Sequence, residues 1–361
     1  MLGGGVFVTQ NKTLPGSYLN FVSGASVTSN LGDRGVVAIA LALPSPRTHG
    51  EGDDAYTEPT TVGTVIEVTA AEFVKGDKSD YLHADYDSAT MKPLREIFLH
   101  ADKVYVYDLG TTKDADDAIA ALEAYEFNVL CAYTSTAADV TAYITAVTNW
   151  RDTMGKKCQV VVYNQTTPNH EGVINVVSTV SDTGADAFAL VAWVAGAEAG
   201  CKVNASCTNM LYDGEYTITC DKTQAQLESC ITNGQIAFHL VYGDVRLLED
   251  VNSLTTTTVD KGEDFKYNQT IRVIDQIAND IAKLFNTKYL GRIPNNASGR
   301  ASFWADVVKH HNELANLGAI EAFDSSQLTV VQGDTKKSIV VNDAITVVNA
   351  MSQLYMTVLV Q

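Results

Sequence analysis

The sequence predicts a multidomain α/β protein with extended strand arms at both ends. Its 361 residues are enough for two to three domains, and 46% apolar against 19% charged side chains is a composition that buries real cores. Apolar strands alternate with helices through the middle of the chain, which is typical of a mainly parallel sheet covered on both faces. We divide the chain into an N-terminal arm (residues 1–21), a small β-rich domain (22–88), an α/β middle domain (89–252), a C-terminal α/β domain (253–349) and a C-terminal strand arm (350–361).

The first 21 residues predict an arm rather than a domain. Three glycines lead into a β-prone run, and a Leu-Pro-Gly turn follows it at residues 14–16. So short a segment cannot bury its own apolar side chains, and we expect it to pair with another segment. The run consists of Val6, Phe7, Val8 and Thr9.

Residues 22–88 predict a small β-rich unit. Two β-prone runs, at residues 36–41 and 62–66, are its expected strands. The loop at residues 51–54 is acidic, and we expect it to be exposed.

The middle domain alternates helices and strands. The expected helices carry apolar residues at helical spacing, and one of them ends before Gly155. The expected strands are apolar throughout, as in a sheet buried on both faces. In chain order these are a helix at 91–101, a strand at 103–107, a helix at 114–125, strands at 128–132 and 159–163 on either side of a helix, a strand at 172–178, and helices at 188–199 and 223–233. A hairpin closes the domain, with strands at 236–242 and 245–248 around a Gly243-Asp244 turn.

The C-terminal domain begins after a run of four threonines at residues 255–258. A helix near residues 268–286 carries an uncharged stripe, which we interpret as core, and a second helix runs from Ser298 to Gly318. Strands are expected at residues 328–332 and 338–341.

The chain ends on a second β-prone run without charge. Its residues are Leu354, Tyr355, Met356, Thr357, Val358, Leu359 and Val360. Such a strand is an aggregation hazard unless it is always paired. Both ends of the chain therefore predict strands that join a sheet elsewhere.

The charge distribution excludes some classes of partner. The net charge is −18, which repels phosphate backbones and anionic bilayers, so we expect no nucleic-acid partner. Residues 1–254 carry 15 Lys and Arg against 32 Asp and Glu, whereas residues 255–361 carry 10 against 11. Either the acidic part simply maintains solubility, or the nearly neutral C-terminal part faces another protein.

Membrane insertion and disulfides are also not expected. The longest apolar run, residues 187–197, is about half the roughly 20 residues that a spanning helix needs. The N-terminus has no signal-peptide pattern. We therefore expect the six cysteines to be reduced and mostly packed.

No motif predicts catalysis, a cofactor or a metal. The nucleophile-elbow, phosphate-loop and dinucleotide patterns are missing from the sequence. Asp182-Thr183-Gly184 resembles the aspartic-protease triplet, but it occurs once, and we interpret it as a helix N-cap before Phe188. His170 lacks a second histidine one helical turn on, and His311 of the adjacent pair His310-His311 is expected in the core. The acidic cluster of Asp114, Asp116 and Asp117 is the ordinary pattern at a helix N-terminus.

The sequence resembles the sheath proteins of contractile phage tails, including the phage-like R-type bacteriocins of Gram-positive bacteria. The matching segments follow one another in order along nearly the whole chain. They are residues 3–7, 14–18, 33–37, 192–200, 211–214, 247–254, 268–280 and 354–358.

The resemblance implies a middle domain related in fold to subtilisin, but the His-Gly-Thr-His and Gly-Thr-Ser motifs are missing, so protease activity is not implied. It also implies hexameric rings that assemble in the host cytoplasm, stack helically around an inner tube, and contract without a nucleotide to drive that tube through a target envelope. Baseplate and tail terminator proteins are further implied partners. Residues 6–9 and 354–360 match the arms that add strands to neighbouring subunits, with Gly3, Gly4 and Gly5 as a hinge.

The nearly neutral C-terminal domain is then expected to face the tube, through an exposed face of its second helix. Two alternatives are a secreted or surface shell or adhesive protein and a hydrolase on the middle domain.

Overall fold

A computed structural model describes residues 31–51, 54–166 and 168–360. The N-terminal arm and its three glycines lie outside the described residues. No helix in the described part of the chain is both long and apolar enough to cross a bilayer.

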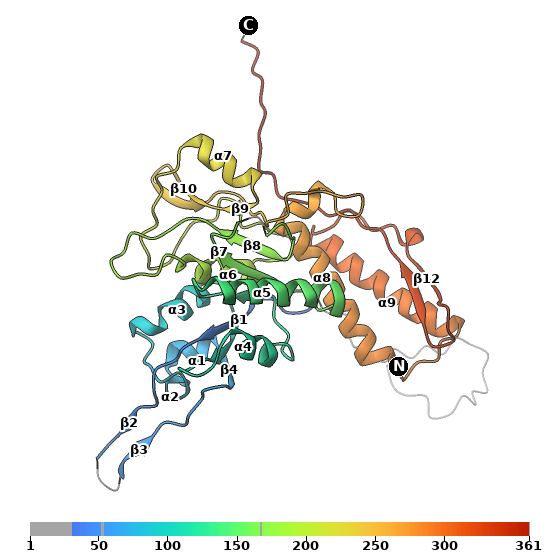
Figure 1. Cartoon of the computed structure of the whole chain (residues 1–361). Helices are drawn as coiled ribbons and strands as arrows, with labels where there is room; N and C mark the ends of the chain where they lie inside the picture. Colours follow the sequence, from blue (N-terminus) through green and yellow to red (C-terminus); the bar gives the residue numbers. More distant parts are fainter. Residues whose placement is uncertain (1–30, 52–53, 167, 361) are drawn as a thin grey trace, which may run out of the picture.

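A seven-stranded sheet forms the centre of the molecule (Figure 1). Its order is β4-β5-β1-β6-β7-β8-β9, and every neighbouring pair is parallel except β4 and β5. The mainly parallel sheet expected from the sequence is confirmed. The strands are β1 (Val36–Leu41), β4 (Val65–Thr69), β5 (Lys103–Asp108), β6 (Val129–Cys131), β7 (Gln159–Tyr163), β8 (Val173–Val176) and β9 (Gln235–Ile236).

The expected separate sheet in residues 22–88 is wrong. β1 lies between β5 and β6, with Val37 opposite both Val104 and Val129, and β4 forms one edge of the same sheet. Residues 37–41 are all buried, so this strand needs cover on both faces, which a small β-rich unit does not provide. Among the described residues of this region, only β2 (Thr48–His49) and β3 (Tyr56–Thr57) pair outside the main sheet, as an exposed ribbon.

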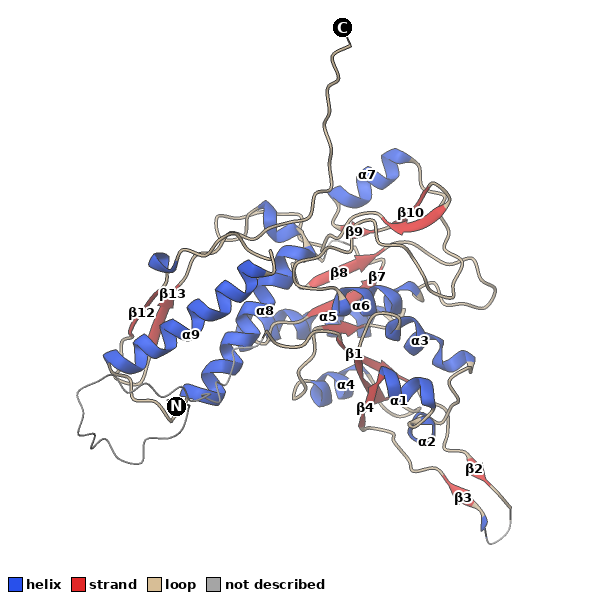
Figure 2. Ribbon diagram, turned by 180° about the vertical axis from the view of Figure 1, so that it is seen from behind, coloured by secondary structure: helices blue, strands red, loops and turns tan. Residues whose placement is uncertain are grey.

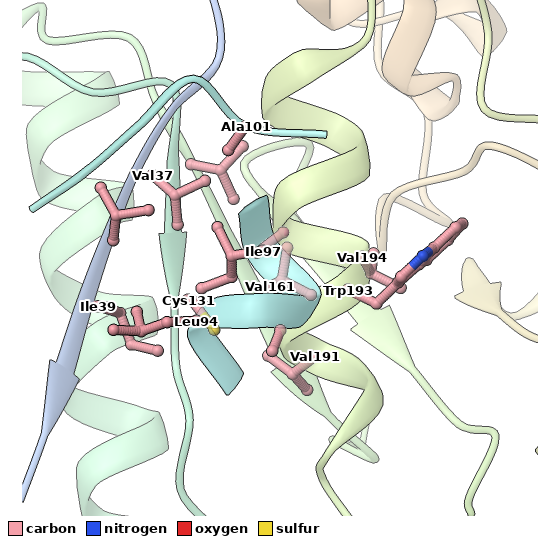
Figure 3. Packing of buried hydrophobic residues seen from close by; sticks show 14 of the residues in the cluster. Val37, Ile39, Leu94, Ile97, Ala101, Cys131, Val161, Val191, Trp193 and Val194 are labelled. Carbon is pink, nitrogen blue, oxygen red and sulfur yellow. The ribbon is translucent and has the colours of Figure 1, made fainter. Parts of the chain in front are cut away.

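Helices cover both faces of the sheet, because successive residues of a strand point to opposite sides. Val37 and Ile39 face α3 (Lys92–Phe98) and α6 (Leu190–Gly200), while Ala38 and Ala40 face α4 (Ala115–Leu122) and α5 (Ala137–Asn149). Figure 3 shows the first face, where Leu94 and Ile97 of α3 meet Val191 of α6. Two short helices, α1 (Ala70–Lys75) and α2 (Ser79–Leu82), lie near the β4 edge.

Close packing of α3 on α6 depends on a glycine. A Cβ at Gly196 would collide with the main-chain carbonyl of Ile97. Ten of the eleven α6 residues are buried, which explains why this segment is apolar all round rather than amphipathic.

A hairpin and a capped helix complete the middle domain. α7 (Gln224–Thr232) begins at the capping box of Thr223 and Gln226. The hairpin joins β10 (Phe238–Val241) to β11 (Asp244–Leu247), and its turn is Tyr242-Gly243, one residue earlier than expected. Both turn residues have positive φ, 51° and 97°, so glycine takes the second position instead of the first.

The C-terminal part consists of two long helices and a two-stranded ribbon (Figure 2). α8 (Asn268–Leu284) and α9 (Ala297–Asn316) pack together with β12 (Thr329–Gln332) and β13 (Ile339–Asn342) around two small cores. π-helical turns extend α5 over Trp150–Met154 and α8 over Phe285–Tyr289. The two helices and the two strands of this part lie where the sequence predicts them.

Candidate assembly site

The C-terminal run leaves the body of the protein. Residues 350–360 form no helix or strand, and all of them are exposed. Leu354 is 85% exposed and Val360 is 90% exposed. Both views show this segment extending away from the rest of the chain (Figures 1 and 2). Residues 354–360 of the expected C-terminal arm therefore form one uncharged, exposed segment outside the packed body of the protein.

One side chain makes two hydrogen bonds to the root of this arm. Gln269, which is 4% exposed, donates from Nε2 to the Val348 carbonyl at 3.1 Å and accepts at Oε1 from the Ala350 amide at 2.9 Å. Its carboxamide thus takes the place of a peptide group in a neighbouring strand. Val347 also bridges to Ile320. The arm is consequently anchored as far as residue 350 and free beyond it.

The ribbon of β12 and β13 has two open edges. The two strands pair only with each other among the described residues. Val331 and Val340, which are paired across the ribbon, are 49% and 45% exposed. Unpaired edges with exposed apolar side chains are templates for a further strand.

The polar face of α8 is buried against the middle domain. Arg272 donates from Nη2 to Glu198 Oε2 at 2.6 Å and to Asp250 Oδ2 at 3.3 Å, and all three side chains are at most 2% exposed. Arg151 makes a two-pronged contact with Asp275, at 2.6 and 2.9 Å. These ion pairs join α8 to the sheet and its helices, so the two domains form a single packed body.

The electrostatic environment of this interface moves the pKa values of its two carboxyl groups, Glu198 and Asp250, in opposite directions. Burial and the neighbouring Asp250 charge raise the pKa of Glu198 well above its ordinary value. Burial also opposes ionisation of Asp250, but the Arg272 charge and several hydrogen bonds outweigh it and lower the pKa of Asp250. The interface thus disfavours a charge on Glu198 and favours one on Asp250, next to the Arg272 guanidinium.

Asp182 does not cap a helix, contrary to expectation. α6 begins at Leu190, after Ala189, and the Asp182 carboxylate instead accepts from the amide of Thr217 at 2.7 Å. The carboxylate holds together two loop segments that bridge nearby at Val180 and Ile218. Asp114, by contrast, caps α4 as expected and accepts from the Asp117 amide at 3.1 Å.

An open pocket of about 650 Å³ lies at the carboxyl ends of β1 and β6. Lys92, Lys113 and Tyr133 contribute to its wall, and the lining includes no serine, cysteine or histidine. Lys92 lies 3.6 Å from the centre of the Tyr216 ring, and Lys113 pairs with Asp117 at 3.3 Å. The pocket brings together acidic, basic and aromatic groups without a nucleophile and base in contact.

His170 belongs to an acidic cluster with Asp152 and Glu171. Its Nδ1 accepts from the Gly172 amide at 2.9 Å, so Nε2 carries the proton and points it at Asp152, 3.2 Å away. Lys261 pairs with Glu171 at 2.7 Å. The ring is therefore a hydrogen-bond donor in a salt-bridge network. His311 is fully buried and all six cysteines are free thiols, four of them buried, as the sequence predicts.

Sequence reasoning missed the anchoring and interface residues. Gln269, Arg272 and Asp275 are ordinary polar residues on an amphipathic helix, where the polar face is expected to meet water. The sequence shows only that α8 carries charged residues beside a long apolar stripe. It does not show that the charged side of the helix packs against another part of the protein.

The family models and the known relatives that match this chain agree on one protein family. The phage tail sheath protein central domain model matches residues 110–253, and the phage tail sheath C-terminal domain model matches residues 260–361. The phage-like element PBSX protein XkdK of Bacillus subtilis (strain 168) is 27% identical over 330 residues, which cover 85% of this chain and 70% of that protein. The tail sheath protein of Clostridium phage phiCD119 is 27% identical over 69% of each chain.

Solved structures share the fold. The sheath tail protein of Desulfitobacterium hafniense superposes with a TM-score of 0.76 at 24% identity, over 93% of this chain and 98% of that one. The helical sheath of the anti-feeding prophage in its contracted state gives a TM-score of 0.70 at 14% identity, over 96% and 99% of the two chains. Because the two family models together match most of the chain from residue 110 to its end, the protein belongs to the contractile phage tail sheath family.

Proposed function

We propose that this chain is the structural subunit of a contractile sheath that polymerises around an inner tail tube in hexameric rings stacked helically. Contraction of the sheath drives the tube through the envelope of a target cell. The observation that carries this proposal is the anchored but unpaired C-terminal arm, residues 350–360, on an otherwise packed protein. An uncharged β-prone segment held at its root and exposed beyond it is suited to joining the sheet of an adjacent copy.

The ribbon of β12 and β13 is the proposed acceptor. Each subunit has two arms, residues 6–9 and 354–360, and the ribbon has two open edges. Adding one strand to each edge would pair the exposed main chain of both partners and cover Val331 and Val340. Main-chain pairing survives a change in subunit orientation, provided that the arm can bend at its root. Gly3, Gly4 and Gly5 supply that freedom at the N-terminus.

In this account the subunit moves as one body during contraction. The buried ion pairs Arg272–Glu198 and Arg151–Asp275 hold the C-terminal domain against the middle domain. Breaking either would leave a buried charge without its partner, at a cost of about 3–5 kcal/mol. The lattice therefore changes at the arms and the surface contacts, and the extended lattice stores the energy without a nucleotide.

The middle domain serves as a scaffold with a subtilisin-like arrangement rather than as an enzyme. The doubly covered parallel sheet supports that fold. The pocket at the carboxyl ends of its strands has no hydroxyl or thiol nucleophile beside a histidine. No cofactor or metal enters the proposed function.

The nearly neutral C-terminal domain would face the inner tube through the exposed side of α9, with the acidic middle domain outside. Small residues such as Ala301 and Ala305 lie on that exposed side and permit a close approach. A chain of similar fold occurs in the anti-feeding prophage baseplate structure, with a TM-score of 0.69 at 16% identity, which supports a baseplate partner. A terminator protein would close the other end, and assembly would take place in the cytoplasm of the bacterial host.

Deletion of residues 354–361 tests the proposal. The exposed arm contributes no packing to the single chain, so the truncated protein is expected to stay folded and soluble. It should fail to form the striated hollow cylinders that the full chain forms in electron micrographs. As a control, Leu354→Val with Leu359→Ile keeps the arm apolar and β-prone and should still assemble. Normal cylinders from the truncated chain would overturn the proposal.

A further inference from the structure

Two of the free thiols meet at the C-terminal end of α6. Cys201 follows the last residue of the helix, and its amide donates to the Ala197 carbonyl at 2.9 Å. The chain then turns back, and the Cys207 thiol donates to the same carbonyl at 3.7 Å. One main-chain oxygen thus holds both cysteines, and their side chains are in hydrogen-bond contact with each other.

The two thiols differ in their access to solvent. Cys207 is fully buried, whereas Cys201 is partly exposed at the rim of the core. A small reagent from solution therefore meets the Cys201 sulfur first, with the Cys207 sulfur directly behind it.

Positive charges surround this pair. Arg272 donates from Nη2 to the Cys207 sulfur at 3.8 Å, and Arg34 donates from Nε to the Cys201 carbonyl at 3.2 Å. The contact with the Cys207 thiol lowers the pKa of Cys201 to about 7, with help from the charges of Arg272 and Arg34 and against the effect of burial. The same contact and burial raise the pKa of Cys207 well above its ordinary value. Because the thiolate is the reactive form of cysteine, Cys201 is the nucleophile of the pair.

We propose that Cys201 and Cys207 form a peroxide-reactive site, in which hydrogen peroxide or a small organic hydroperoxide converts the two thiols to a disulfide. In the first step the Cys201 thiolate sulfur bonds to one peroxide oxygen, the O–O bond breaks, and the other oxygen leaves as hydroxide or alkoxide and takes up a proton. Cys201 is now a sulfenic acid. In the second step the Cys207 sulfur bonds to the Cys201 sulfur, the S–O bond breaks, and the oxygen leaves as water with the Cys207 proton. The two sulfur atoms are oxidised by two electrons in total, and the peroxide is reduced by two.

The site lies beside the contact that holds α8 on the middle domain. Arg272, which donates to the Cys207 sulfur, also donates to the Ala205 carbonyl at 2.7 Å in the loop between the two cysteines. A disulfide removes the S–H group that Cys207 donates to Ala197 and rearranges this loop. If the chain assembles in a bacterial cytoplasm, which rests on the proposed function, the pair stays reduced there and is oxidised after the particle leaves the cell. The reaction itself does not depend on that function.

The experiment treats the unassembled full chain with hydrogen peroxide at pH 7, alkylates the remaining thiols and maps the tryptic peptides by mass spectrometry. Cleavage after Lys202 separates the two cysteines, so the disulfide should appear as two joined peptides, with fragmentation locating the bond at residues 201 and 207. Cys207→Ser should stop the reaction at a sulfenic acid on Cys201, which dimedone traps. Cys201→Ser should leave Cys207 a free thiol. Oxidation of Cys207 in that variant, or both thiols intact in a wild-type chain whose Cys220 is oxidised, would overturn the proposal.

A second measurement needs no variant. Cys220 is the matched control, because it is also partly exposed but burial and the Asp221 charge raise its pKa. At pH 7 iodoacetamide should alkylate Cys201 at least about fivefold faster than Cys220, since the larger thiolate fraction outweighs the weaker nucleophilicity of a thiolate of lower pKa. Equal rates would contradict the site. Hydrogen exchange in residues 202–208 should differ between the reduced and oxidised chains, and identical exchange would contradict a rearranged loop. None of these readouts requires sheath assembly, so their failure and that of the proposed function can be told apart.

Discussion

Arg272 and Glu198 meet 2.6 Å apart in the interior of the protein, and they join the first helix of the C-terminal domain to the central helix of the middle domain. The contact is fully buried, and Arg272 also donates to the Ala205 carbonyl at 2.7 Å. A polar interface of this kind fixes the relative orientation of the two domains through directional hydrogen bonds.

Arg272→Met should cost about 3–5 kcal/mol in the free energy of unfolding, because Asp250 loses the cation that balances its charge. Urea denaturation of the unassembled chain measures this. Arg246→Met, at a half-buried arginine that pairs with Asp244 on the surface, is the matched control and should change stability by less than about 1 kcal/mol. Equal effects of the two changes would contradict a tight interface.

Glu198→Gln should make the protein less sensitive to alkaline pH. The folded-state pKa of Glu198 is raised, so its contribution is complete below the unfolded value near 4.3 and is lost as pH rises through the folded value. Glutamine keeps an acceptor for Arg272 and a donor for Asp250 and has no proton to lose. The variant should gain stability relative to wild type from pH 5 to pH 8. A constant difference across that range would show that Glu198 is ionised in the folded protein.

Gln269→Ala should release the arm root without unfolding the protein. It removes both hydrogen bonds to residues 348 and 350, each worth about 1–3 kcal/mol when a buried group is left unpaired. Hydrogen exchange in residues 346–350 should become faster, while the strands of the central sheet keep their protection. Gln327→Ala, at an exposed position, is the control. Unchanged exchange at the root would mean that the bridge between Ile320 and Val347 anchors the arm by itself.

Leu359→Asp should separate folding from assembly. Leu359 is 81% exposed in the single chain, so the free energy of unfolding should change by no more than about 0.5 kcal/mol. A charge within the added strand should nevertheless block cylinder formation, as scored by sedimentation and electron microscopy. Val259→Asp places the same charge on a fully exposed loop and should assemble normally. Cylinders from the Leu359 variant would exclude a buried position for the arm.

Gly196→Ala should destabilise the middle domain by about 1–3 kcal/mol, because its Cβ meets the Ile97 carbonyl and α3 must move away from α6. Gly262→Ala is the control, since open space surrounds Gly262 and its φ is −76°. Thermal unfolding of both variants checks this prediction.

The sequence predicts those helices and strands whose signals lie within the element or directly beside it. The capped start of α4 at Asp114, the αL glycine Gly155 after α5 and the apolar run of α6 each specify their own element. The placement of β1 could not be predicted, because its partners Val104 and Val129 lie far along the chain and a central strand has the same apolar pattern as a small sandwich strand.

The candidate site also has one part that the sequence predicts and another that it does not. The exposed arm is a local property of an uncharged β-prone run next to the chain end, and the sequence predicts it. Its anchor at Gln269 depends on segments that meet only after folding. His311 lies in the core as expected, and its neighbour His310 is buried beside it on α9, with the two Nδ1 atoms 3.3 Å apart.

Hydrogen exchange of residues 354–360, measured on the free chain and again on assembled cylinders, tests the central claim most directly. Strand addition between subunits predicts amides that exchange within seconds in the free chain and are strongly protected in the assembly, together with new protection in β12 and β13. Amides that stay fast in intact cylinders, or that are already protected in the free chain, would contradict it.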